Sequence, residues 1–301
     1  MKSRAERNEI YFNWIEGALV HEIELIGPDG ADPALSREDS DVAGNVFRKT
    51  NDAYTVRVGG DGTGETRGRY RFVHNTFLLG REHRPVFRVF DGIESIEMHG
   101  NVIASEGGGG VRVAITEDAK WVTGREAMFG TNNWIPQGSR DVPAGWTGTQ
   151  AGRDPGFENL SVFDLRPRQG SPLRDAATKD PRCPSEFAFP SPLTKVLFQP
   201  PRRSAAEPVL IREQDQAPDI GAYEGGFALR AVLQSQVEPA SLRTAGGAGG
   251  TLGPARPGAG AGRCGCQVTG ALGNSAFAWL LASAAALSVV VRRRCRPIAM
   301  P

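Results

Sequence analysis

One short pattern recurs five times between Asn8 and Ile135, as Ile10-Tyr-Phe-Asn13-Trp-Ile15, Val42-Ala-Gly-Asn45-Val-Phe47, Phe72-Val-His-Asn75-Thr-Phe77, Met98-His-Gly-Asn101-Val-Ile103 and a looser Gly130-Thr-Asn-Asn133-Trp-Ile135. An apolar residue follows the asparagine by two places in all five copies and precedes it by three places in four of them. Successive asparagines are 32, 30, 26 and 32 residues apart. Self-similarity at such a period indicates stacked structural units.

Each unit reads as a set of short strands joined by turns. The copies are rich in Val, Ile, Phe and Tyr, lack helical spacing and are bounded by Gly, Asp and Asn. A second strand is predicted in each unit, at residues 21–25, 54–58, 86–90 and 110–113. Stacked coils bring equivalent residues to about 4.8 Å, so apolar side chains form a column and asparagine amides bond from coil to coil. The sequence therefore predicts an all-β fold, a parallel β-helix. The alternative is a β-sandwich, whose strands need not repeat a turn residue at this period.

A family resemblance begins in residues 2–17, Lys2-Ser-Arg-Ala-Glu-Arg-Asn-Glu-Ile-Tyr-Phe-Asn-Trp-Ile-Glu-Gly17. This segment resembles a coil of the right-handed parallel β-helix proteins of bacterial surfaces and of secreted polysaccharide-acting enzymes. That family closes its solenoid with a series matched here by Asp154-Pro-Gly-Phe157, Phe163-Asp-Leu-Arg166, Gly170-Ser-Pro-Leu-Arg-Asp175 and Asp219-Ile-Gly-Ala-Tyr-Glu224. The resemblance covers residues 1–224 and implies a right-handed solenoid with a closing region at 150–224, where Phe157, Phe163 and Leu165 cover the last coils. Ala177 departs from the pattern, because the family has glycine there for a left-handed turn.

Composition limits the classes of partner. The chain has 301 residues, with 35 Lys and Arg against 34 Asp and Glu, so no field of one sign exists to hold nucleic acid, and no nucleic-acid partner is expected. Cysteine is absent from the first 182 residues, so the solenoid is held by its stacked core. The charged start, from Met1 to Arg7, carries neither an export signal nor a solenoid cap. We therefore expect the chain to begin inside a longer gene product, which a stop codon just upstream would contradict.

The second strands predict a column of charged side chains. Side chains alternate along a strand, so the inward apolar pairs fix which residues face outward. The inward pairs are Ile23/Leu25, Val56/Val58, Phe87/Val89 and Val111/Val113. The outward column then consists of Glu24, Arg57, Arg88 and Arg112. Nearby turns supply His21, Asp29, Asp61 and Asp91. Three stacked arginines repel one another unless anions lie between them.

Two interpretations of this column stay open. In the first, the arginines are solvated or paired with Glu24, Asp61 and Asp91 and bind no ligand. In the second, they form a row of subsites for uronic-acid carboxylates, because guanidinium groups bind carboxylates at two points. A β-elimination lyase also needs a base, for which His21 is the candidate. A hydrolase needs a carboxylate pair, for which Asp61 and Asp91 are the candidates.

No cofactor is predicted. Asp29-Gly30 and Asp61-Gly62 are compatible with calcium only if further oxygens converge on them. No Cys or His pair within the solenoid has zinc-ligand spacing. Cys183 lies in the proline-rich stretch 181–208, which we interpret as an extended insertion, and is interpreted as a spare thiol.

The C-terminal third predicts a linker and a membrane segment. Residues 225–263 are rich in Gly, Ala and Pro and do not offset their ordering entropy. Gly270 to Val291 is a run of 22 residues without a charge, followed by Arg292-Arg-Arg-Cys-Arg296. This pattern predicts one transmembrane helix with the arginine cluster on the cytoplasmic side and the solenoid outside.

Residues 264–296 resemble the MYXO-CTERM type of C-terminal sorting signal, because Cys264-Gly-Cys266, the apolar helix and the arginine cluster occur in order. The resemblance implies cleavage near Cys264 or Cys266 by a processing protease in the inner membrane, followed by display at the cell surface or outer membrane. The sequence thus predicts an exported, surface-displayed β-helix protein that binds or degrades polysaccharide, with acidic polysaccharide as one candidate, as a lyase or glycoside hydrolase. The alternative is a non-catalytic adhesion solenoid that binds a partner or matrix.

Overall fold

The described part of the chain contains the predicted repeat. The computed structural model describes residues 1–27, 38–60, 68–81, 83–90, 93–116, 128–181, 189–193, 195–201, 210–214 and 216–226. These residues belong to the first of two compact units, Met1–Ala240, whereas the second, Ser241–Pro301, lies outside the described residues. Cys183, Cys264, Cys266 and the predicted transmembrane helix also lie outside them. Within the described residues, no helix is long and apolar enough to cross a membrane.

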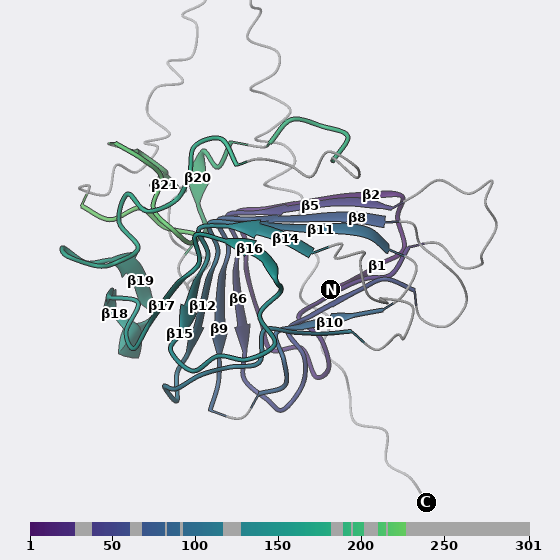
Figure 1. The fold of residues 1–301 in the computed structure, drawn as a ribbon, viewed down its shortest axis with the longest axis horizontal. Helices are drawn as coiled ribbons and strands as arrows, with labels where there is room; N and C mark the ends of the chain where they lie inside the picture. Colours follow the sequence, from purple (N-terminus) through teal and green to yellow (C-terminus); the bar gives the residue numbers. More distant parts are fainter. Residues whose placement is uncertain are drawn as a thin grey trace, which may run out of the picture. The chain divides into compact units, whose positions relative to one another are not determined.

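The described strands form a parallel β-solenoid with three faces (Figure 1). Sheet A contains β1 (Lys2–Ser3), β4 (Ile23–Leu25), β7 (Val56–Val58), β10 (Phe87–Val89) and β13 (Ala114–Thr116). Sheet B contains β2 (Arg7–Tyr11), β5 (Asp39–Ala43), β8 (Gly68–Val73), β11 (Ile93–His99), β14 (Met128–Thr131) and β16 (Gly145–Thr147). Sheet C contains β3 (Trp14–Glu16), β6 (Val46–Lys49), β9 (Thr76–Leu79), β12 (Val102–Ser105), β15 (Trp134–Pro136) and β17 (Gln150–Gly152). Within these three sheets every pairing is parallel and joins strands that are two or three strands apart along the chain. The β-helix prediction is therefore confirmed and the sandwich is excluded.

The repeated asparagines form one continuous ladder at the bend between sheets B and C. The side-chain oxygen of Asn75 accepts hydrogen bonds from the backbone nitrogen and the Nδ2 of Asn45, both at 3.0 Å. Asn101 accepts the same two bonds from Asn75, at 2.9 and 3.0 Å. The ladder continues from Asn101 to Asn133, and it begins with Asn13 bound to Asn45. The predicted single file of asparagines is therefore confirmed.

The bend itself is made by the residue just before each ladder asparagine. Those five residues, Phe12, Gly44, His74, Gly100 and Asn132, all have a positive φ, between 50° and 66°. A single left-handed residue turns the chain sharply from one sheet into the next. Two of the five are glycine, which adopts this conformation without strain. For the other three, the left-handed conformation costs about 1 to 3 kcal/mol per residue.

The core lies inside the three sheets. The pairs Ile23/Leu25, Val56/Val58 and Phe87/Val89 are fully buried, as predicted. Phe47 and Phe77 stack across adjacent coils with ring centroids 5.3 Å apart and an interplanar angle of 12°. Phe77 in turn meets Phe87 edge-on at 5.2 Å. Like residues therefore touch like along the solenoid, which is what a stack of similar coils produces.

The closing region covers the outer face of sheet C. Its elements include β18 (Phe157–Asn159), the short 3-10 helix η1 (Leu160–Val162) and β19 (Asp164–Pro167) (Figure 1). Phe157 and Leu165 pack in a cluster with Val46, Leu78 and Trp134. Phe163 also meets Trp14 at 6.1 Å between ring centroids. The sequence suggested that the closing region covers only the last coils. In the structure it also reaches back to the first coil, through the contact between Phe163 and Trp14.

A second part of the closing region locks into the solenoid backbone. Gly221 donates its backbone N–H to the carbonyl of Gly100 at 2.8 Å. It has a φ of 104°, and a Cβ there would lie 2.9 Å from a methyl of Val102, so glycine is required. The left-handed residue of the preceding turn is Asp175, with a φ of 53°, whereas Ala177 is not left-handed. Alanine is therefore tolerated at position 177 because the turn is made two residues earlier.

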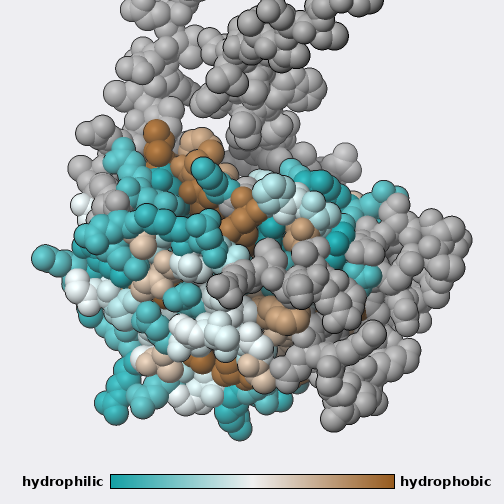
Figure 2. Space-filling model, turned by 45° about the horizontal axis from the view of Figure 1, so that its top comes forward, coloured by the Kyte–Doolittle hydropathy of each residue, from teal (hydrophilic) through white to brown (hydrophobic). Residues whose placement is uncertain are grey.

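Residues 189–193 and 195–201, here called the strap, lie against the outer face of sheet B. Leu193 and Val196 pack on Ala43 and Val73. The strap ends in β20 (Phe198–Gln199), which pairs with β21 (Leu210–Ile211). In the view of Figure 2 the described surface is mostly hydrophilic, with hydrophobic residues gathered in separate patches. Large hydrophobic side chains that are exposed include Leu19, Val20, Val162, Leu197 and Ile211.

Candidate functional site

The predicted charged column exists over three strands of sheet A. Glu24 on β4 is in register with Arg57 on β7, and Arg57 is in register with Arg88 on β10. The residues on either side of each are buried in the core, so these three side chains face outward. Because parallel neighbours lie about 4.8 Å apart, they form a straight row along the solenoid. We call Glu24, Arg57 and Arg88, with the rings of Tyr54 and Phe90, the arginine row.

Arg57 is held in place by three kinds of contact. Its Nη1 forms an ion pair with the carboxylate of Glu24. Its Nη2 lies 3.4 Å from the carbonyl oxygen of Gly60, and its guanidinium carbon is 4.3 Å from the centroid of the Phe90 ring. The side chains of Arg57 and Glu24 keep only 13% and 16% of their surface exposed. The pairing of Arg57 with Glu24, which the first interpretation expects, is therefore present.

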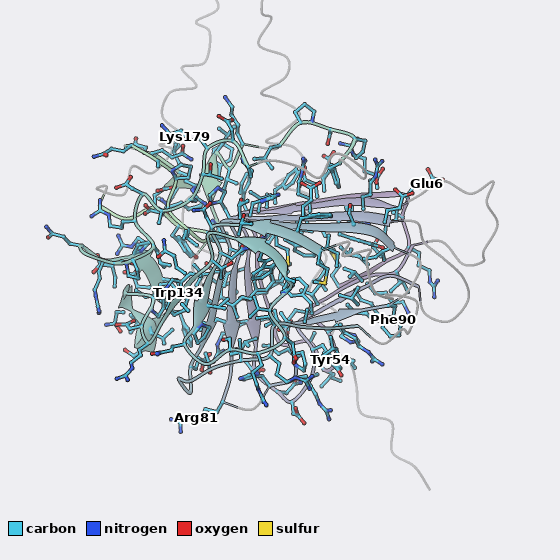
Figure 3. The ribbon with its side chains drawn as sticks, in the orientation of Figure 1. Glu6, Tyr54, Arg81, Phe90, Trp134 and Lys179 are labelled. Atoms are coloured by element: carbon cyan, nitrogen blue, oxygen red, sulfur yellow. The ribbon has the colours of Figure 1, made fainter. Side chains whose placement is uncertain are left out.

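Aromatic rings accompany both arginines. The guanidinium carbon of Arg88 lies 4.7 Å from the centroid of Phe90 and 5.2 Å from that of Tyr54. Figure 3 shows Tyr54 and Phe90 on the same side of the solenoid, beside sheet A. A guanidinium group is attracted to the face of an aromatic ring. The rings therefore contact both neighbouring arginines, and the Glu24 carboxylate contacts Arg57.

Arg112 does not belong to the row. Strand β10 pairs with β13 through Phe87 and Ala114, so the residue in register with Arg88 is Ile115. Arg112 precedes β13, is exposed and pairs with Asp141. The predicted alignment of Val111 and Val113 with Phe87 and Val89 is therefore wrong by three positions. Val111 and Val113 are nevertheless buried, which is why the alternation was misleading.

His21 lies next to the arginine row. Its ring stacks on Tyr54, with centroids 6.1 Å apart and an interplanar angle of 27°. Burial is the main cause that lowers the pKa of His21 to about 4. The nearby carboxylate of Glu24 raises this pKa, whereas the positive charges of Arg57 and Arg88 lower it further. The imidazole is therefore neutral at pH 7. Both ring nitrogens are buried and have no hydrogen-bond partner within the described residues, so a substrate proton reaches them only if the ring turns.

The acidic candidates cannot be placed in this site, since Asp29, Asp61 and Asp91 lie outside the described residues. The predicted carboxylate pair and the calcium ligands therefore stay predictions. Within the residues that the structure describes, no three His, Cys, Asp or Glu side chains gather in a way that would hold a metal ion.

A polar hollow opens at the corner between sheets C and A, and the sequence analysis missed it. It has a volume of about 310 Å³ and is lined by Arg48, Thr50, Asn51, Gly80, Arg81 and Glu106, which together we call the corner hollow. Arg48 binds the Glu106 carboxylate at two points, 2.6 and 3.2 Å. Its guanidinium carbon also lies 4.4 Å from the centre of the Phe163 ring.

A signal for the corner hollow exists in the repeat. Thr50, Gly80 and Glu106 each follow a ladder asparagine by five residues. Asn51 and Arg81 follow by six. Residues at one offset in a stacked repeat lie in one column. Extending the alignment beyond the apolar positions would have brought these polar residues together.

Comparison with known proteins adds no assignment to this geometry. The chain matches no protein-family model, no curated protein and no solved structure.

Proposed function

We propose that this protein is a right-handed β-helix that binds acidic polysaccharide along the outer face of sheet A. The observation that carries the proposal is the arginine row, in which Arg57 and Arg88 share the ring of Phe90 and stand one strand spacing apart. A straight row with a regular period suits a linear polymer with a regular repeat. Guanidinium groups bind carboxylates, and the half-buried rings offer apolar area to sugar rings.

Binding is favoured over catalysis by the state of His21. A general base needs its nitrogen within hydrogen-bond reach of the proton that it removes. Both nitrogens of His21 are buried beneath the surface of the described residues. The neutral imidazole is compatible with a base, so β-elimination is the second candidate activity, with His21 as the proton acceptor. Hydrolysis by Asp61 and Asp91 is a third possibility that rests on the sequence alone.

Replacing Arg88 with alanine is expected to weaken binding of polygalacturonate to the full chain by about 10-fold or more, because a charged hydrogen-bond donor is lost. Arg57→Ala is expected to act in the same direction. Affinity is measured by titration in phosphate-free buffers of equal salt concentration. Equal salt keeps the screening of charge interactions the same for every variant. Arg7→Ala is the control, because Arg7 carries the same charge on β2 of sheet B and is 58% exposed.

Three outcomes separate the candidate activities. Growth of the ultraviolet absorbance of unsaturated uronates identifies a lyase. New reducing ends without that absorbance identify a hydrolase. Binding without either product leaves a non-catalytic adhesion solenoid, which is the alternative function. Unchanged affinity in both the Arg57 and the Arg88 variants would show that the arginine row is not the binding face.

The proposal includes display of the solenoid outside the cell. It is supported by the sequence pattern of Cys264-Gly-Cys266, the uncharged run Gly270–Val291 and the arginines that follow it. A signal of this type is removed during sorting, so the mature protein is expected to end near Cys264 or Cys266. Mass spectrometry of the protein isolated from its own cell tests this directly. A mature chain that still contains Arg292 would contradict it.

A further inference from the structure

We propose that Thr131 is the nucleophile of a second site, on the outer face of sheet B, that cleaves a neutral carboxylic ester. His99 is its general base, and Glu97 is the residue that positions this base. All three lie on two neighbouring strands, β11 and β14 (Figure 1). The inference goes beyond the proposed function, because it concerns a different face and a different reaction, and it does not depend on the arginine row.

The three side chains form one chain of hydrogen bonds. His99 and Thr131 are in register on adjacent parallel strands, and the Nδ1 atom of His99 lies 2.9 Å from the hydroxyl oxygen of Thr131. The other ring nitrogen, Nε2, lies 3.3 Å from Oε2 of the Glu97 carboxylate. An ionised carboxylate only accepts hydrogen bonds, so in the neutral ring Nε2–H donates to Glu97 and Nδ1 accepts the hydroxyl proton of Thr131. A hydroxyl held by an imidazole that a third group orients is the arrangement of an activated nucleophile.

The hydroxyl of Thr131 can be reached from the last coil. Thr131 is half-buried, whereas the side chains of His99 and Glu97 are 2% and 0% exposed. The next residue in register on sheet B is Thr147 of β16, which is exposed. The inner end of the hydrogen-bond chain is fixed, because the backbone N–H of Phe189 in the strap donates to Oε1 of Glu97 at 3.3 Å. The base is thus shielded from water, while the nucleophile lies on the side that faces Thr147.

Buried charge on sheet B is an independent sign of a site. Asp41, Arg71 and Glu97 are in register in one outward-facing column, and all three are buried. The covered face of sheet C is apolar instead, with Val46 and Trp134 packed under the closing region. Burying charged groups stabilises a fold less than burying apolar area. Fold stability alone therefore does not account for the charged column on sheet B.

The charges of this column favour a neutral substrate. Asp41 and Glu97 carry two negative charges, and Arg71 carries one positive charge, which its two-point contact with Asp41 neutralises. The Glu97 charge next to His99 therefore repels an anion such as a phosphate ester or a uronate. A carboxylic ester is uncharged, and its carbonyl carbon is electrophilic enough to react with a hydroxyl. An ester is therefore the substrate class that fits this nucleophile.

The reaction balances with the groups that are present and water. The hydroxyl oxygen of Thr131 forms a bond to the acyl carbon while Nδ1 of His99 takes the hydroxyl proton. The bond from the acyl carbon to the alcohol oxygen then breaks, and the alcohol leaves with the proton that His99 returns. Water attacks the acyl-threonine in the same way, with His99 again as the base. The products are one alcohol and one carboxylic acid, and Thr131 is regenerated.

Acylation of the full chain by p-nitrophenyl acetate tests this inference. After a short reaction stopped with acid, peptide mass spectrometry is expected to locate an acetyl group on Thr131. Thr131→Val is expected to abolish that adduct and to slow p-nitrophenol release to the rate of the urea-unfolded chain, whereas Thr131→Ser keeps a hydroxyl and should retain both. Thr147→Val is the matched control, because the Thr147 hydroxyl donates to the carbonyl of Gly130 and not to an imidazole. It is expected to leave the rate within about twofold.

Variants of the base and of its positioning residue give different signatures. His99→Gln is expected to slow acylation by about 100-fold, since a general base contributes roughly 100- to 10,000-fold. Glu97→Gln is expected to lower the limiting acylation rate by about 10-fold and to leave the ester concentration for half-maximal rate unchanged, because Glu97 acts on the imidazole and not on the ester. Urea unfolding of each variant shows whether a lost rate is a lost fold.

Three outcomes would overturn the inference. Acetyl groups found on lysines and not on Thr131 would show that the hydroxyl is not activated. An equal yield of acetyl-Thr131 in the urea-unfolded chain would show that the fold contributes nothing to the reaction. Equal loss of rate in Thr131→Val and Thr147→Val would show that contact with His99 is not what matters. Glycan binding enters none of these measurements, so failure of the proposed function would leave this result standing, and the reverse also holds.

Discussion

Replacing Asn75 with alanine is expected to lower the free energy of unfolding by about 4 kcal/mol, because each buried polar group left without a partner costs about 1 to 3 kcal/mol. Asn75 is fully buried in the middle of the ladder. The substitution removes the acceptor of two hydrogen bonds from Asn45 and the donor to the carbonyl of Val42, which lies at 2.9 Å. It also removes the Nδ2 bond to Asn101 at 3.0 Å. The loss is measured by urea unfolding of the full chain, followed by tryptophan fluorescence.

Asn13→Ala is the control at the end of the same ladder. Asn13 is half-buried, and its side chain donates to Tyr11 and Asn45 at 2.7 and 3.1 Å. Its backbone N–H still reaches Asn45 after the substitution, at 2.9 Å, so no buried group of Asn45 is orphaned. The expected loss is about 1 kcal/mol. Equal losses in the two variants would mean that the amide ladder does not carry the stability assigned to it.

The ladder and the inward pairs could be predicted because each rests on a local pattern that the stacking repeats. Asn45 and Asn75 recur at one place in the coil, and an amide is the side chain that both donates and accepts along a column. Alternation fixes the inward face of a strand once its register is known. The solenoid, the row of Arg57 and Arg88 and the position of His21 beside that row could therefore be predicted from the sequence.

Register in the fourth coil could not be predicted from alternation. The stretch from Val111 to Thr116 has apolar residues in both phases of a two-residue period, with Val111, Val113 and Ile115 in one phase and Ala114 in the other. A shift by an odd number of positions exchanges the two faces of a strand, and apolar residues in both phases leave alternation unable to decide which phase faces the core. Neighbouring strands decide between them, and β10 pairs with Ala114 onward. Arg112 was assigned to the row for this reason.

The bends and the strap had no local signal. Phe12, His74 and Asn132 adopt the left-handed conformation at the bend, although glycine is the residue that usually takes this conformation. The ladder hydrogen bonds hold them there, and those bonds are contacts between coils. The strap is held by residues more than a hundred positions away, since Arg71 donates to the carbonyl of Ser191. Contacts of that separation leave no periodic pattern in the sequence.

Replacing Arg71 with methionine is expected to lower the free energy of unfolding by about 3 to 5 kcal/mol, the cost of breaking a buried ion pair on one side. Arg71 is fully buried and binds Asp41 at two points, 3.1 and 2.7 Å, while the Asp41 side chain is 3% exposed. Arg71 also donates to the carbonyls of Ser191 and Pro192, both at 3.0 Å, and lies 4.1 Å from the centre of the Phe189 ring. The variant should therefore loosen the strap as well. Limited proteolysis, with cleavage mapped to residues 189–201, measures that second effect.

Two comparisons separate the ion pair from the strap. Arg69 lies on the same strand as Arg71 and makes a similar two-point contact with Asp39 on β5. These side chains are 14% and 17% exposed, so Arg69→Met is expected to lower the free energy of unfolding by only about 1 kcal/mol. Replacing both Arg71 and Asp41, with methionine and leucine, removes the orphaned charge and should restore most of the stability. The strap should stay sensitive to protease in that double variant, because its two carbonyls still lack their donor. If the double replacement restores protection of the strap, packing of Val196 and Leu193 on sheet B holds it, and the guanidinium group does not.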